Sequence, residues 1–220
     1  MYEVKKSDIS TYQRIRDKFR YGLVLQSIRN QLAKLGFNVR LYYFVMEGLF
    51  DLETPSIKGD IEKTEIGFLT LDDMNIVGKY FRGYPAEEIM EWLDRGKMCL
   101  GLRYDKNIVA FMWINFKECT FDIKKIYLKE DECYLSDMYT VESYRGRNFA
   151  ALLRHKSYKI LKEMGRVKIY SITEYFNKSA ARYKQKLKAV NLKLILYVSL
   201  FRIIKFSVTL KSYEKNLKLT

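Results

Sequence analysis

Histidine, cysteine and proline are scarce in this chain, and each scarcity excludes a class of protein. His155 is the only histidine among 220 residues, so no zinc site built on several histidines and no H-E-x-x-H helix can form. Cys99, Cys119 and Cys133 form no C-x-x-C pair, which predicts reduced thiols in a cytoplasmic protein, and no metal site is expected. With only 2 prolines and 48% hydrophobic residues, the composition is that of a globular chain with a buried core.

Long apolar runs and an apolar leader are also missing. Residues 1–10 are mostly polar, so no secretory signal is expected. The longest apolar stretch, Leu194 to Phe201, is too short to span a bilayer and is followed by Arg202. The sequence therefore predicts no transmembrane segment.

Charge is plentiful but unevenly distributed. The chain carries 40 basic and 26 acidic residues, a net charge of +14. Residues 1–62 have a net charge of +2, residues 63–140 of −3 and residues 141–220 of +15. The excess begins at about residue 141 and indicates an anionic partner: a phosphorylated cofactor, nucleic acid or a membrane surface.

The N-terminal part of the chain is expected to form a helix and a strand. The helix is predicted from Ser7 or Asp8 to about Leu35 and the strand from Asn38 to Met46. Pro55 and Gly59 then indicate a loop, at which we place a boundary. The expected division is an N-terminal helix–strand extension (1–60), a main domain (61–213) and a tail (214–220).

The main domain is expected to alternate strands with helices. Strands are predicted at 66–71, 98–104, 108–116, 133–141 and 167–173, and helices at 72–80, 85–96, 148–164 and 179–187. A final hairpin is predicted from strands at 192–200 and 203–210. This order predicts a mixed α/β fold with one central sheet.

The most informative segment runs from Met138 to Ala150. A strand leads into a turn with Arg145, Gly146 and Arg147, and then directly into an amphipathic helix. Such a unit aims free backbone N–H groups and the positive end of a helix at one place, which suits a pyrophosphate. An ordinary tight turn with solvated arginines is the alternative interpretation.

This segment and its context resemble the GNAT acetyltransferase superfamily. The family's cofactor loop has the form Arg/Gln-x-x-Gly-x-Gly/Ala, and this chain has Arg145-Gly-Arg-Asn-Phe-Ala150, with Asn148 in place of the middle glycine. The hairpin at 98–116, the loop-bearing unit, the strand at 167–173 and the following helix come in the family's order. The resemblance covers roughly residues 63–210 and implies a mostly antiparallel central sheet flanked by helices.

The resemblance also implies a cofactor site. Acetyl-CoA, or another acyl-CoA, would place its pyrophosphate on the loop, that is on Arg145, Gly146, Arg147, Asn148, Phe149 and Ala150. Its pantetheine arm would pair with the backbone of Met138 and Thr140, where that strand and the strand at 167–173 splay apart. Asn177 matches an asparagine that often contacts the cofactor in the family, although a plain helix N-cap explains it equally well.

Candidate acid and base groups follow from the same resemblance. Many family members carry a glutamate at the position of Tyr134; Glu132 lies two residues away on the same strand face, and a solvated carboxylate is the favoured alternative for it. The family often uses a tyrosine seven residues after the asparagine, which falls on Lys184 here. Tyr183 is one residue short, a turn of about 100° on a helix. We retain Tyr183 as the candidate acid.

Taken together, the resemblance implies an acyl-CoA-dependent N-acyltransferase, most simply an acetyl-CoA:amine N-acetyltransferase with direct transfer to a primary amine. The acceptor would be a small molecule or a peptide, and a homodimer is left open. A catalytically degenerate acyl-CoA-binding protein and nucleic-acid binding through the basic stretch 178–193 are the alternatives, the latter ranked low. Peripheral membrane contact through the basic, aromatic C-terminal hairpin is a further minor one.

Overall fold

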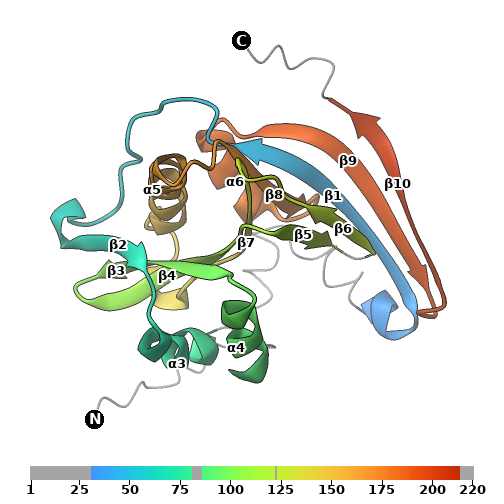
Figure 1. Cartoon of the computed structure of the whole chain (residues 1–220), viewed down its shortest axis with the longest axis horizontal. Coiled ribbons are helices and arrows are strands. Elements are labelled where there is room, and N and C mark those ends of the chain that lie inside the picture. Colours follow the sequence, from blue (N-terminus) through green and yellow to red (C-terminus); the bar gives the residue numbers. More distant parts are fainter. Residues whose placement is uncertain (1–30, 81–85, 122, 214–220) are drawn as a thin grey trace.

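A computed structural model describes residues 31–80, 86–121 and 123–213, and its centre is an eight-stranded sheet (Figure 1). The strands lie in the order β10-β9-β1-β8-β7-β4-β3-β2, in which β7 and β8 are parallel and all other neighbours are antiparallel. The strands are β1 (Phe37–Glu47), β2 (Thr64–Phe68), β3 (Met98–Tyr104), β4 (Asn107–Asn115), β7 (Glu132–Thr140), β8 (Lys168–Glu174), β9 (Val190–Leu200) and β10 (Ile204–Ser212). Strands β5 (Glu118–Phe121) and β6 (Lys124–Tyr127), which the sequence did not predict, form a separate hairpin.

Helices cover both faces of the sheet. They are α3 (Leu71–Tyr80), α4 (Ala86–Asp94), α5 (Phe149–Glu163) and α6 (Lys178–Lys186), with short 3-10 turns at Ile61–Lys63 and Glu142–Tyr144. Strand β4 shows why two layers of helices are needed. Its residues Ala110 and Met112 join the core under α5, whereas Phe111 and Trp113 join the core under α3 and α4. The predicted mixed α/β fold, with a mostly antiparallel sheet flanked by helices, is confirmed.

Strand β1 lies inside the sheet rather than beside it. It pairs with β9 along one edge and with β8 along the other. The expected boundary at residue 60 stays a prediction, but a strand from its N-terminal side is thus an integral part of the sheet. Most of the helix expected from residues 7 or 8 to 35 lies outside the described residues, and residues 31–34 of it are helical.

The parallel strands β7 and β8 pair over only part of their length. Their register begins at Glu132 with Lys168 and ends at Leu135 with Ser171, although β7 continues to Thr140 and β8 to Glu174. Beyond Leu135 the β7 backbone is therefore no longer bonded to β8. This opening is the place at which the candidate site forms.

A buried ionic cluster fastens β1 to α5 and α6. Glu47, at the end of β1, has no exposed surface and accepts hydrogen bonds from Nε and Nη2 of Arg154 at 2.8 and 2.7 Å. Tyr158 donates its hydroxyl to the same carboxylate at 2.6 Å, and Ser171 donates to it as well. From α6, the Lys184 ammonium lies 3.3 Å from Glu47 Oε1.

Protonation in this cluster follows from its burial and its charges. Burial alone would raise the pKa of Glu47, but Arg154 and Lys184 outweigh it and hold this pKa well below its usual value. Burial lowers the pKa of Lys184 to about 8, although Glu47 acts in the opposite direction. With Lys184 protonated, the three side chains carry a net charge of +1 in the interior, which is costly.

The cluster predicts that replacing its two cations will change the free energy of unfolding by very different amounts. Arg154→Met leaves the buried Glu47 carboxylate without its bidentate guanidinium partner, so we expect the free energy of unfolding to fall by about 3–5 kcal/mol. Lys184→Met leaves the neutral Glu47–Arg154 pair, so at neutral pH we expect a much smaller loss or a slight gain. Urea unfolding followed by circular dichroism measures both.

The effect of Lys184→Met on the free energy of unfolding should also depend on pH, which tests the assigned pKa of Lys184. A lysine in the unfolded chain titrates at about 10.4, above the folded value of about 8, so the unfolded state binds more protons between these two values. Wild-type stability relative to Lys184→Met should therefore rise with pH, by about 2 kcal/mol between about pH 7 and about pH 9.5. Equal destabilisation by both substitutions, or a difference independent of pH, would contradict this account.

Candidate functional site

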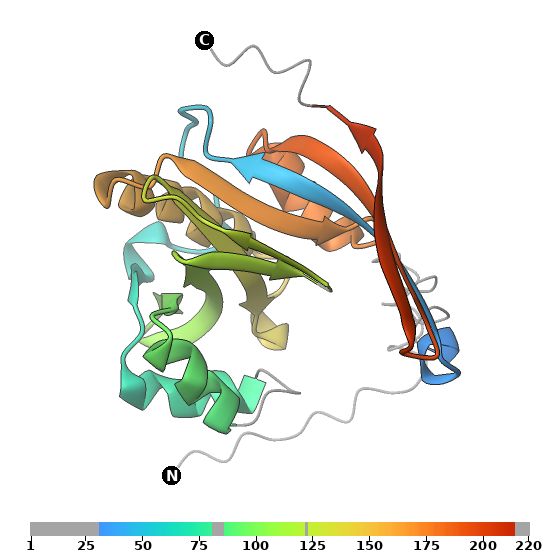
Figure 2. The same ribbon diagram turned by 45° about the vertical axis from the view of Figure 1, so that its right-hand side comes forward.

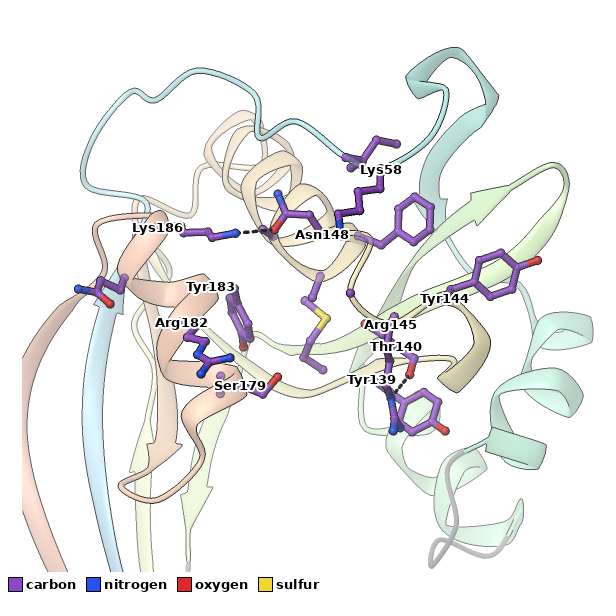
Figure 3. Close-up of a pocket in the computed structure, with 18 of the residues that line it drawn as sticks. Lys58, Tyr139, Thr140, Tyr144, Arg145, Asn148, Ser179, Arg182, Tyr183 and Lys186 are labelled. Atoms are coloured by element: carbon purple, nitrogen blue, oxygen red, sulfur yellow. Dashed lines mark hydrogen bonds between the residues drawn. The ribbon is translucent and has the colours of Figure 1, made fainter. Parts of the chain in front are cut away.

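A cavity of about 1010 Å³, which we call the main cavity, lies where β7 leaves β8. It is surrounded by the end of β7, the loop before α5, the first turn of α5, one side of α6 and residues 56–58 (Figure 3). Its lining includes four basic and no acidic side chains; the basic ones are Lys58, Arg145, Arg182 and Lys186. The cavity is therefore electrostatically suited to an anion.

The loop before α5 has the shape that the sequence predicted for a phosphate cradle. Gly146 has φ +80°, and a Cβ placed there would meet no atom within 4 Å, so its surroundings are open. Asn148, the N-cap of α5, has φ 70° and ψ 14°, a left-handed conformation that asparagine tolerates. Asn148 thus occupies the backbone conformation for which the family pattern has glycine.

The amino end of α5 is left without a side-chain cap. Asn148 makes no capping hydrogen bond, because its Nδ2 donates to the Ser56 carbonyl at 2.6 Å and its Oδ1 accepts from Lys186 at 3.2 Å. The first backbone bond of the helix runs from Leu152 N to Asn148 O. The amides of residues 149–151 are the ones that a helix cannot satisfy internally, and they lie at the cavity.

Residues 56–58, in the loop that Pro55 and Gly59 indicate, form one wall of the cavity. Arg147 Nε donates to the Lys58 carbonyl at 2.8 Å, and Lys58 N donates to the Arg147 carbonyl at 3.0 Å. The ring nitrogen Nε2 of His155 lies 2.9 Å from the Leu52 carbonyl. Arg147 itself stacks over Tyr104, 4.6 Å from the ring centre, and is not among the residues that line the cavity.

The half of β7 that pairs with β4 but not with β8 supplies the floor of the cavity. Met138 and Thr140, the two residues predicted to face the cofactor arm, both line the cavity. Arg145 folds back over this strand end and donates through Nε to the Thr140 carbonyl at 3.2 Å (Figure 3). A kink precedes Met138: the β4–β7 register shifts here, and Asp137 has φ 49°.

Helix α6 brings Asn177 and Tyr183 to the opposite wall. Asn177 lines the cavity and also caps α6, since its Oδ1 accepts from Ala180 N at 3.0 Å. Tyr183 lines the cavity too, and burial raises its pKa to about 12, so its phenol stays protonated at neutral pH. Lys184, at the position where the family pattern has tyrosine, faces the buried cluster instead. The one-residue offset therefore places the phenol, and not the ammonium, at the cavity.

The two candidates on the first half of β7 lie elsewhere. Glu132 accepts from Lys129 N at 3.0 Å and from the Tyr170 hydroxyl at 3.3 Å, and it does not line the main cavity. Tyr134 lines a second cavity of about 290 Å³, together with Asp137. Burial raises the pKa of Tyr134 well above its usual value. The structure thus does not bring Glu132 and Tyr134 together with Tyr183.

Sequence reasoning missed several residues of the main cavity, including the cations Lys58, Arg182 and Lys186. Ser179, Arg182 and Lys186 share one face of α6 with Tyr183, and their spacing of three and four residues could have revealed them. Lys58 gave no signal, because only tertiary contacts bring residues 56–58 to α5. Cys133 is fully buried in the core, where burial raises its pKa to about 12.

The residues present suit a CoA pyrophosphate. A pyrophosphate binds well to free backbone amides and to basic side chains with no carboxylate among them. The cavity offers the uncapped end of α5, the open surroundings of Gly146 and four basic side chains. Across residues 31–80, 86–121 and 123–213, no group of three or more His, Cys, Asp or Glu residues could hold a metal ion. Nor is any helix within these residues long and apolar enough to cross a membrane.

Solved structures share this fold at low sequence identity. An acetyltransferase of the GNAT family from Colwellia psychrerythraea is 11% identical, with a TM-score of 0.56 over 91% of this chain and 76% of that one. A GNAT-family acetyltransferase from Novosphingobium aromaticivorans is 19% identical, with a TM-score of 0.50 over 75% of this chain and 66% of that one. A Drosophila protein is 11% identical, with a TM-score of 0.54 over 80% of this chain and 57% of that one. The chain thus spans less than two thirds of the length of the last two.

Comparison of the amino-acid sequence with known protein families identifies the family of this chain. Curated protein sequences yielded no match to the chain. The model of the acetyltransferase (GNAT) family, however, matches residues 68–188, more than half of the chain. That range contains the cavity-lining part of β7, the loop before α5 and the first turns of α6. The chain belongs to the GNAT acetyltransferase family.

Proposed function

We propose that this protein is an acyl-CoA-dependent N-acyltransferase, and specifically an acetyl-CoA:amine N-acetyltransferase that transfers directly to a primary amine. One observation carries the proposal: the uncapped amino end of α5 opens into a cavity with four basic and no acidic side chains, beside the half of β7 that does not pair with β8. Free helix amides and basic side chains that converge on one cavity favour an anionic ligand over solvent alone.

Binding would divide among three elements. The amides of Phe149, Ala150 and Ala151 receive the pyrophosphate, with Arg182 and Lys186 as neighbouring cations. Met138 and Thr140 have backbone groups that are not bonded to β8, although the Thr140 carbonyl accepts from Arg145 Nε, and amide groups of a pantetheine arm would pair with this strand segment. Arg147 supports the loop from behind through residues 56–58.

Transfer requires a neutral amine and a proton for the leaving group. Acetyl-CoA would supply the thioester that the amine attacks. Tyr183, protonated at neutral pH, would donate its phenolic proton to the sulfur as the C–S bond breaks, and the proton that the nitrogen loses on forming the amide would return the phenol to its neutral state. The second cavity includes the carboxylates of Glu88, Glu118 and Asp137, and we assign the acceptor amine to that side of β7.

A binding protein without catalysis is the second candidate. It is favoured by the position of Glu132, whose carboxylate is held by Lys129 N and Tyr170 away from the main cavity. The two candidates differ in one measurement. An enzyme releases free thiol from acetyl-CoA in the presence of polyamines, amino sugars or peptide N-termini, whereas a binder releases none with any of them.

Ala150→Asp tests the cradle without threatening the fold. A carboxylate in the first turn favours the helix dipole, so we expect unchanged or slightly raised stability, but it repels a pyrophosphate. Titration calorimetry should show acetyl-CoA affinity falling by about 100-fold or more. Val167→Asp changes the charge equally at an exposed position before β8 and should bind like the wild type. Unchanged affinity in Ala150→Asp would show that this loop is not the cradle.

Tyr183→Phe tests the proposed acid. We expect kcat to fall by about 100-fold with little change in acetyl-CoA affinity, because only proton donation is lost. Since the pKa of Tyr183 is about 12, wild-type kcat should show no loss from its ionisation up to about pH 10. Glu132→Gln is the comparison variant and should retain most activity. The opposite pattern, with Glu132→Gln inactive and Tyr183→Phe active, would reverse the assignment.

A further inference from the structure

Three strands extend beyond the rest of the sheet as an arm. The outer half of β1, with residues 31–36 before it, pairs with the outer half of β9, and β10 continues the sheet as its edge strand (Figures 1 and 2). We call residues 31–41 and 194–213 the arm. The tip of the arm joins the two segments, because Phe201 N donates to the Gly36 carbonyl and the Phe37 and Phe201 rings lie 4.9 Å apart.

The tip is covered with exposed apolar side chains. Ile203 is 84% exposed, Leu35 68% and Phe201 60%. The remaining exposed apolar residues of the tip are Leu32, Phe37 and Ile204, and the series continues along β10 with Phe206, Val208 and Leu210. None of these residues belongs to a core cluster. A patch of this kind indicates a surface that meets a partner.

The turn at the tip keeps large side chains in an unfavourable conformation. Ile203 N donates to the Leu200 carbonyl, so Phe201 and Arg202 are the two central residues of the turn, with φ 51° and 62°. Asparagine and glycine adopt this turn at lower cost, and they are the usual residues there. The contact of Phe201 with Phe37 offsets part of this cost, but a basic side chain at the outermost point of the hairpin, in a conformation that disfavours it, indicates a role for the turn beyond folding.

The charge of the arm has one sign. It carries five basic residues, Lys34, Arg40, Arg202, Lys205 and Lys211, and no acidic residue. These charges are separate from those of the cavity, so the arm accounts for part of the C-terminal excess that a CoA site does not need. The arm therefore suits a partner that is both anionic and apolar.

We propose that the arm is a docking surface for an anionic lipid membrane, which the tip enters with Phe201 and Ile203 while Arg202 and Lys205 remain at the headgroups. Exposed aliphatic and aromatic side chains flanked by basic residues suit the boundary between headgroups and acyl chains. This surface is independent of the acyltransfer site and would place an active enzyme at a membrane.

Two other partners fit the same surface less well. Nucleic acid offers bases that stack on aromatic rings, but Leu35, Ile203 and Ile204 are aliphatic. A second copy could pair along β10, but the antiparallel register centred on Val208 would set Lys205 opposite Lys211. Like charge across that edge opposes self-association.

Sedimentation of the full chain with vesicles tests the proposal. We expect binding to vesicles of phosphatidylcholine with phosphatidylserine, at least about tenfold weaker binding to phosphatidylcholine alone, and loss of binding as salt is raised. The double variant Phe201→Asn/Arg202→Gly suits the turn and should fold. It should bind the anionic vesicles about tenfold or more weakly than the wild type, with its acetyl-CoA affinity unchanged.

Matched variants and competing partners complete the test. Ile203→Ser should weaken vesicle binding without altering the turn, whereas Met164→Ser/Val167→Ser, which removes exposed apolar groups from the body, should not. No binding to anionic vesicles, or equal binding by the tip variants, would overturn the proposal. So would vesicle-independent binding to random RNA that the tip variants abolish, or a wild-type dimer in light scattering that they dissociate.

Discussion

The hydrogen-bonded ion pair between Glu47 and Arg154 is the interaction on which the rest of the structure depends. It joins β1, far from the family motif in sequence, to the helix that begins at the phosphate loop. Lys184 extends the pair to α6, and the same helix presents Tyr183 to the cavity. A buried pair of this kind adds little stability over apolar residues of similar size. Its value here lies in fixing the relative positions of the two helices that line the site.

The opening of β7 from β8 converts this scaffold into a site. Because their pairing stops at Leu135 and Ser171, the next backbone groups of β7 face a cavity rather than another strand. The uncapped end of α5 lies at the same cavity, so polar backbone and basic side chains converge there without a carboxylate. The net charge of +14 then has two local explanations, a cavity suited to a phosphorylated ligand and an arm of a single charge sign.

The sequence predicted local elements well and tertiary placement less well. The loop before α5 was recognisable because a strand, a glycine turn and an amphipathic helix are adjacent in the chain, and the GNAT order of elements gave the fold. Residues 56–58 were not recognisable as a wall, since their contacts with Arg147 and Asn148 span about ninety residues. Hairpin β5–β6 is short and was missed, and the position of Lys184 was settled only by its buried partner Glu47. The roles of Tyr183, Glu132 and Asn177 stay predictions.

The central claim is that the free amides at the start of α5 bind the pyrophosphate of acetyl-CoA. Residue-resolved amide hydrogen exchange, with and without acetyl-CoA, tests it most directly, because it observes those N–H groups themselves. The account predicts that saturating acetyl-CoA slows exchange at Phe149, Ala150 and Ala151 more than at the amides of α4. Binding that leaves these three amides unchanged, or protects only another part of the chain, would contradict it.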